Sequence, residues 1–202
     1  MNLKQTYSIL ALAAACFLSI GWADNGEGIK SGADQVKSIR ADFLQEKHMK
    51  ILTRPLISTG VLFYRIPGSL RWEYTSPVKS LLLMHDSKTR RFIQSREGLV
   101  EDTGAGLQAM QFVMQEITRW FGGRFDENPD FTATLEGDGR IVLRPKKQAM
   151  AGIIERIELV LSDRPGVIRS VAIHESEDTF TRIIFNNARP NEVLPDAVFQ
   201  EA

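Results

Sequence analysis

The sequence has a single cysteine, Cys16, among its 202 residues. One thiol cannot form an intramolecular disulfide, and it cannot supply the cysteine pairs of a structural zinc site. An excess of charge of one sign is also absent, because 25 lysines and arginines balance 25 aspartates and glutamates. Bulk charge therefore gives no reason to expect nucleic acid as a partner, since that binding needs a basic surface.

Recognisable catalytic motifs are absent too. There is no Gly-x-Ser-x-Gly elbow, no phosphate-binding loop and no His-Glu-x-x-His pattern, and His48, His85 and His174 lie far apart in the sequence. The acidic segment 174–178 is typical of an exposed hairpin tip, with a weak cation site as the alternative. We therefore predict no enzyme activity, no cofactor and no metal site, although the fold could still assemble a carboxylate pair from distant positions.

The first 23 residues have the pattern of an export signal. Lys4 supplies a positive charge, residues 7–20 are apolar and uncharged, and Ala23 ends a site with small residues. The apolar run is shorter than the roughly 20 residues that span a bilayer. We predict cleavage after Ala23 and a single periplasmic domain over residues 24–202. In the alternative interpretation, Cys16 is a lipid-modified N-terminus.

The segment Ser58–Pro77 predicts a β-hairpin with one aromatic face. Residues 61–65 are a β-prone run, Pro67-Gly68 suits the central positions of a type II turn, and residues 70–75 alternate between apolar and polar. Side chains alternate across a strand, so one face should carry a broad apolar set. Its members are Leu62, Tyr64, Ile66, Leu70, Trp72 and Tyr74.

Further strands are predicted along most of the chain. The turns recur about every ten residues, which is typical of a meandering antiparallel sheet or barrel. We expect these strands at residues 80–84, 89–94, 99–100, 131–135, 140–145, 153–161, 167–174, 179–185 and 197–199.

Two segments have helical spacing. After a glycine-containing lead at residues 25–32, apolar residues in 33–50 recur at helical intervals, although 41–49 also fits an alternating strand. The segment 107–121 is amphipathic and ends at a glycine pair. Its apolar stripe includes Met110, Val113, Met114 and Ile117. Such a helix over an apolar sheet face either closes a dry core or covers a cleft for an apolar ligand.

The order of these elements resembles the LolA-like periplasmic carriers, which shelter the acyl chains of outer-membrane lipoproteins. The similarity extends over the chain after the export signal and includes segments 43–45, 58–62 and 70–74. It continues through segments 143–146, 157–161 and 178–185.

This resemblance implies an unclosed half β-barrel, mainly antiparallel β with a helical lid over an apolar concave face. The hairpin residues named above, with Met110, Val113, Met114 and Ile117, would line the cleft. An acylated lipoprotein or another envelope lipid would be the ligand of a monomeric carrier, with an inner-membrane donor complex and an outer-membrane acceptor.

One position departs from the family pattern. The arginine expected immediately before the hairpin proline, thought to hold the lid shut, is replaced by Ile66, and Arg65 should point to the opposite face. Two other functions stay open: an envelope lipid-sensing or protein-interaction domain on the same scaffold, and an enzyme with a lipid-sized cleft.

Overall fold

The computed structural model describes residues 20–86, 88–104, 107–137 and 139–202, and its main feature is one antiparallel sheet. The strand order is β6-β5-β4-β3-β2-β1-β11-β10-β9-β8-β7, so the sheet is unclosed, with β6 and β7 at its edges. Because each strand pairs with a sequence neighbour except where β1 joins β11, the topology is close to a simple meander. In chain order the strands are β1 (Ser38–His48), β2 (Leu56–Arg65), β3 (Ser69–Ser76), β4 (Ser80–His85), β5 (Lys88–Ser95), β6 (Gly98–Glu101), β7 (Phe131–Glu136), β8 (Arg140–Pro145), β9 (Arg156–Leu161), β10 (Ile168–Ser176) and β11 (Thr179–Pro190).

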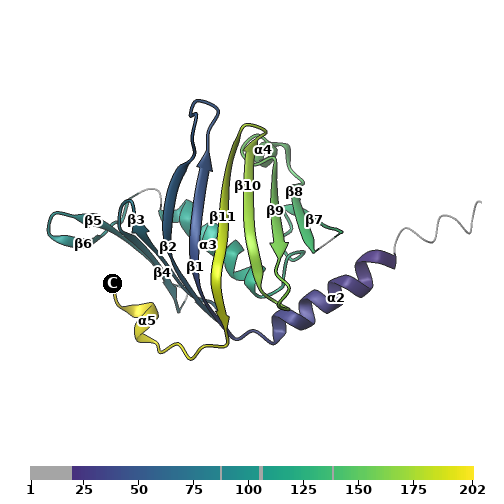
Figure 1. Ribbon diagram of the computed structural model, residues 1–202, viewed down its shortest axis with the longest axis horizontal. Coiled ribbons are helices and arrows are strands. Elements are labelled where there is room, and N and C mark those ends of the chain that lie inside the picture. Colours follow the sequence, from purple (N-terminus) through teal and green to yellow (C-terminus); the bar gives the residue numbers. More distant parts are fainter. Residues whose placement is uncertain (1–19, 87, 105–106, 138) are drawn as a thin grey trace, which may run out of the picture.

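The described helices are α2 (Ile20–Asp34), α3 (Leu107–Phe121), α4 (Gln148–Ala151) and α5 (Ala197–Gln200). Figure 1 shows α3 lying against one face of the curved sheet, while α2 extends away from it at one end. The predicted fold class, a half-barrel of antiparallel strands with a helix over its concave face, is confirmed.

The main core lies between the sheet and α3. Ile117, Trp120 and Phe121 of α3 are buried against the inner side chains of the central strands. The ring of Phe121 stacks on Tyr64 at a centroid distance of 5.4 Å and meets Phe185 edge-on at 5.6 Å. These aromatic contacts fix the C-terminal half of α3 on the sheet.

The outer face of the sheet carries the C-terminal segment. Arg65 donates to the carbonyl oxygen of Leu194 at 2.6 Å, and Arg71 donates to the carbonyl oxygens of Val198 at 3.1 Å and Glu201 at 2.6 Å. Both arginines lie on the polar side of the hairpin, as the alternation predicts. The chain end is thereby held against the back of β2 and β3.

The hairpin prediction is confirmed, but its turn was assigned wrongly. Leu62 pairs with Trp72 and Tyr64 with Leu70, so these side chains share one face. The turn hydrogen bond runs from the Gly68 amide to the Arg65 carbonyl, and the Ile66–Pro67 peptide is cis. Ile66 and Pro67 therefore occupy the central positions of a type VI turn, and the type II turn around Pro67-Gly68 is incorrect.

The predicted helix over residues 33–50 is also wrong, because most of this segment is strand β1. Ile39 and Phe43 are four residues apart, which places them on one face of a helix but also on one face of a strand. Strand β1 pairs with β2 on one side and with β11 on the other, so its backbone N–H and C=O groups find hydrogen-bond partners in the sheet. This pairing favours the strand over the helix.

Two smaller predictions fail at the ends of the chain. Residues 25–32 belong to helix α2, and residues 197–199 form the start of helix α5 where a strand was expected. Phe199 of α5 is buried at 1% exposure, below the guanidinium of Arg65. Packing of this one ring on the outer face, which the short apolar segment did not reveal, anchors the helix.

Candidate ligand-binding cleft

An apolar cleft of about 420 Å³ lies between the middle of α3, at Val113 and Ile117, and the inner face of the sheet. This volume is within the range of about 300–1,000 Å³ that small-molecule sites occupy. Nine apolar or aromatic side chains line it, with three polar ones: Trp72, Tyr74, Leu82, Val113, Ile117, Ile153, Ile154, Ile173 and Ile183, and Gln45, Glu175 and Thr181.

Three aromatic rings form one wall of the cleft and its support. Phe43 lies 4.7 Å from Trp72 and 5.2 Å from Tyr74 between ring centroids, so it holds both lining rings from behind. Phe43 itself packs on Gly60, where a Cβ would lie only 2.4 Å from the ring. The glycine therefore lets the strand backbone approach the ring closely, as no other residue could.

The polar groups of the cleft are few and mostly satisfied. The Tyr74 hydroxyl donates to Gln45 Oε1 at 2.8 Å. Burial raises the pKa of Tyr74, against the opposing effect of its contacts with Trp72 and Gln45, so the phenol stays neutral and able to donate. Lys47 forms an ion pair with Glu175, which lies at the edge of the cleft.

The indole Nε1 of Trp72 is buried and has no hydrogen-bond partner of normal geometry within the described part of the chain. Leaving such a donor unpaired costs about 1–3 kcal/mol.

The predicted cleft residues divide into four groups. Trp72, Tyr74, Val113 and Ile117 line the apolar cleft. Leu62, Tyr64 and Leu70 face the same side but are sealed beneath α3, with exposures of 0%, 1% and 0%. Ile66 is 38% exposed and lies at the other end of the sheet. The side chains of Met110 and Met114 lie outside the described part of α3.

Several lining residues escaped prediction from the sequence. Leu82, Ile173 and Ile183 occupy strands that were predicted, on the face shared with buried neighbours such as Val171 and Phe185. Alternation within each strand could have indicated them. Ile153 and Ile154 follow the short helix α4, and only the fold brings them to the cleft.

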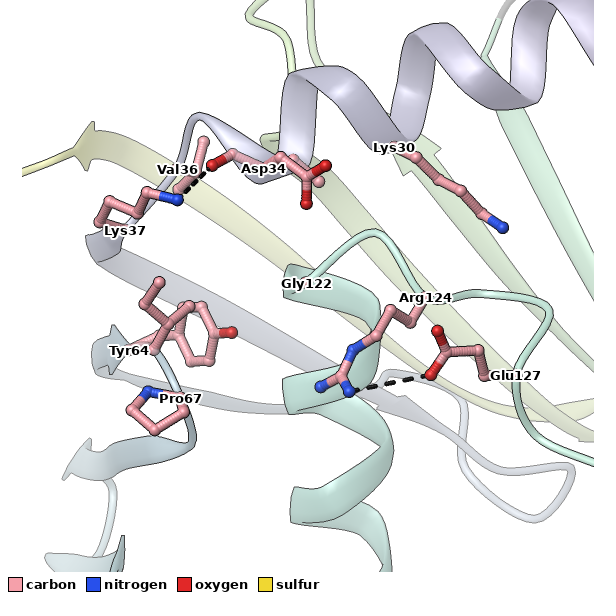
Figure 2. Close-up of a pocket in the computed structure, with 11 residues that line it drawn as sticks. Lys30, Asp34, Val36, Lys37, Tyr64, Pro67, Gly122, Arg124 and Glu127 are labelled. Carbon is pink, nitrogen blue, oxygen red and sulfur yellow. Dashed lines mark hydrogen bonds and ion pairs between the residues drawn. The ribbon is translucent and has the colours of Figure 1, made fainter.

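A second hollow, of about 410 Å³, lies below the C-terminal end of α2 (Figure 2). Its charged side chains are engaged locally: Lys37 donates to the Asp34 carbonyl at 2.6 Å, and Arg124 lies 3.8 Å from Glu127. Lys30, drawn at its upper edge in Figure 2, pairs with Asp126 at 3.1 Å. The positive side chains therefore compensate helix C-termini and nearby acids, which is a structural role.

Residues 34–202 match the family described as "Outer membrane lipoprotein carrier protein LolA". The chain belongs to the LolA family. It is 19% identical to the outer-membrane lipoprotein carrier protein of Pseudoalteromonas translucida (strain TAC 125), over 98% of this chain and 92% of that one. Identity to the protein of the same name from Dechloromonas aromatica (strain RCB) is 23%, over 99% of this chain and 93% of that one.

Solved structures share the LolA-family fold at low identity. MucB aligns with a TM-score of 0.55 and 13% identity, over 91% of this chain but only 64% of MucB. An uncharacterised conserved protein from Thermus thermophilus aligns with a TM-score of 0.53 and 8% identity, over 88% of this chain and 94% of that one. These likenesses concern the fold alone.

Among the residues that the structure describes, no helix combines the length and the apolar character needed to cross a membrane. No group of three or more histidine, cysteine, aspartate or glutamate side chains in the same part of the chain is arranged to hold a metal ion.

Proposed function

We propose that this LolA-family protein is a periplasmic carrier that shelters the acyl chains of a lipoprotein, or of another envelope lipid, in the cleft between α3 and the sheet. The observation that carries the proposal is the composition of the cleft, in which nine of twelve lining side chains are apolar or aromatic. Hydrocarbon gains about 0.8 kcal/mol for each methylene removed from water, so such a site needs apolar area above all.

The manner in which α3 covers the cleft supports reversible binding. Ile117, Trp120 and Phe121 anchor the helix by apolar contact, while Val113 toward its N-terminal end is 43% exposed. Val113 lies over the cleft together with Ile117. Movement of the helical turn that carries Val113 would enlarge the cleft without breaking the aromatic contacts of Phe121.

Transfer in this proposal involves burial and release without bond chemistry. The carrier would receive its lipid from an inner-membrane donor and deliver it to an outer-membrane acceptor. Export to the periplasm would depend on the signal predicted at residues 1–23, with cleavage after Ala23. Lipidation at Cys16, in contrast, would anchor the protein to a membrane.

The proposal is tested by extracting the purified protein with organic solvent and by titrating it with a fluorescent fatty acid. We expect copurified lipid and saturable uptake. Trp72→Glu should lower uptake strongly, because it places an unpaired charge in an apolar wall. Ile153→Glu, at a position 68% exposed, tests the cleft with less risk to folding.

Val193→Glu is the matched control, since Val193 is 92% exposed and lies on the C-terminal segment away from the cleft. Far-UV circular dichroism checks that each variant is folded. Absence of both copurified lipid and fatty-acid uptake in the unmodified protein would refute the carrier function.

The alternative is an envelope interaction domain that recognises a protein. The solved complex of MucA with MucB motivates it, because MucB has the same fold, with a TM-score of 0.52 and 15% identity over 61% of its chain. An empty cleft, with no uptake by a folded protein, would favour this function over transport.

A further inference from the structure

The loop between β1 and β2, residues 49–55, presents apolar side chains to solvent. Ile51 is 82% exposed and Leu52 is 39% exposed, and at the start of β2 Leu56 and Ile57 are 57% and 45% exposed. Four large apolar residues therefore lie in the open within seven positions. Grouped exposure of this kind, unlike scattered single residues, indicates contact with another surface.

The loop stands at the same end of the molecule as the mouth of the cleft. Strand pairing ends at Lys47 with Leu56 and at His48 with Phe180, so the loop continues beyond the last pairs. Figure 1 shows it reaching farther than α4 and the β10–β11 turn at that end. Ile153, just after α4, lines the cleft and is also 68% exposed.

The charges of the loop favour a bilayer surface as its partner. Lys50 and Arg54 flank Ile51 and Leu52, and no acidic residue occurs between Lys47 and Glu73. Glu177 and Asp178 of the β10–β11 turn line a hollow beside the loop. Lys50 lies 3.7 Å from Asp178, but both side chains are mostly exposed, at 79% and 61%. Such a pair is worth little and leaves the ammonium free to meet another anion.

The apolar tip of the loop suits the acyl region of an anionic bilayer, and the basic side chains beside it suit the headgroup region. Apolar side chains gain free energy at the acyl boundary, while lysine and arginine extend their charged ends to the headgroup phosphates. Each basic residue near an anionic surface adds to the attraction.

We propose that the β1–β2 loop docks the protein onto an anionic phospholipid bilayer, with Ile51 and Leu52 in the acyl boundary and Lys50 and Arg54 at the headgroups. This inference rests on the carrier function proposed above, because docking at this end brings the mouth of the cleft next to the acyl chains that it takes up.

Vesicle flotation tests the docking. The purified protein is mixed with vesicles of phosphatidylcholine and phosphatidylglycerol, or of phosphatidylcholine alone, and the bound fraction is measured. We expect the double variant Ile51→Ser/Leu52→Ser to bind the mixed vesicles at least about tenfold more weakly. Lys50→Gln/Arg54→Gln should lower binding to the mixed vesicles and change little with phosphatidylcholine alone.

Val193→Ser serves as the matched control, because it removes an apolar side chain that is even more exposed, at 92% against 82% for Ile51. Its neighbour Glu192 accepts a hydrogen bond from Ser38 at the start of β1, the end of that strand opposite to the loop. This variant should bind vesicles as the unmodified protein does. In addition, the emission of Ile51→Trp should shift to the blue when vesicles are added.

Three outcomes would overturn the docking: no flotation of the unmodified protein with either vesicle, equal flotation of the Ile51→Ser/Leu52→Ser variant, or loss of binding in the charge variant alone. The first of these would leave the exposed loop to a protein partner. Fatty-acid uptake, measured in parallel, separates the two proposals. Intact uptake without flotation rejects docking only, whereas flotation without uptake or copurified lipid rejects the carrier function.

Discussion

Replacing Gly60 with alanine should destabilise the fold and disturb the wall of the cleft together. A Cβ built at Gly60 would lie 2.0 Å from the carbonyl oxygen of Glu73, and 2.4 Å and 2.6 Å from two ring carbons of Phe43. The carbonyl belongs to the neighbouring strand β3, so it cannot move without shifting the strand. The Phe43 ring also packs against Trp72 and Tyr74, which line the cleft, so a shift of this ring disturbs their packing.

The size of the effect follows from these contacts. Overpacking a well-packed interior costs about 1–3 kcal/mol, and the involvement of backbone places Gly60→Ala near the upper end, at about 3 kcal/mol. For a chain of this length, each kcal/mol lowers Tm by about 2–4 °C. We therefore expect Tm to fall by about 6–12 °C, and the affinity for a fluorescent fatty acid to fall with it.

Thermal denaturation followed by circular dichroism measures the first effect. Gly28→Ala is the control, since nothing lies within 4 Å of a Cβ at that position in helix α2. It should leave Tm unchanged or raise it slightly, because alanine favours helix. A Tm for Gly60→Ala equal to that of the unmodified protein would refute the packing argument.

A double-mutant cycle with Phe43→Leu locates the strain. Leucine removes the ring atoms nearest to the new methyl group, so the double variant should be less destabilised than the sum of the two single changes. The rescue should be partial, because the contact with the Glu73 carbonyl remains. If the losses of stability in the two single variants simply add up in the double variant, the ring of Phe43 does not contribute to the destabilisation by Gly60→Ala.

The remaining predictions concern the outer face of the sheet. Replacing Arg65 and Arg71 together with methionine should release the C-terminal segment 191–202, because both guanidiniums donate to its carbonyl oxygens; limited proteolysis should then remove it about tenfold faster. An unchanged cleavage rate would assign its anchoring to other contacts. Burial, reinforced by the charge of Arg156, lowers the pKa of His174, so the unfolded chain binds the proton first and stability should fall as pH drops below about 6.5. A His174→Phe variant should show a weaker pH dependence of Tm between pH 7 and about 5, and identical profiles would exclude His174 as a cause.

The sequence was sufficient for most strands because their patterns were unambiguous. The 131–145 hairpin has an Asp-Gly pair between two β-prone runs, and the second arm of the Ser58–Pro77 hairpin alternates, so the strand signals agree with the fold. Helix α3 was equally clear, because its apolar residues recur at helical spacing and a glycine pair ends it.

Strand β1 was mispredicted because its decisive interactions are distant in sequence. It pairs with β11, about 140 residues away, and no local pattern reports that contact. The cleft was predictable only where one hairpin and one helix contributed to it. Ile153 and Ile154 reach it through the topology of the sheet, and the sealing of Leu62 and Leu70 depends on where α3 comes to rest.

The position of Arg65 bears on how α3 is held closed. Since Arg65 is committed to the C-terminal segment on the outer face, the helix is retained mainly by Ile117, Trp120 and Phe121 on the inner face. Burial of three such side chains is worth about 5–9 kcal/mol, at about 1.5–3 kcal/mol each. An entering acyl chain recovers about 0.8 kcal/mol per methylene, so about six to eleven methylenes offset complete release of the helix. A lid held by apolar contact is therefore released completely only by a ligand that replaces those contacts, and a chain much shorter than this should leave Trp120 and Phe121 packed on the sheet.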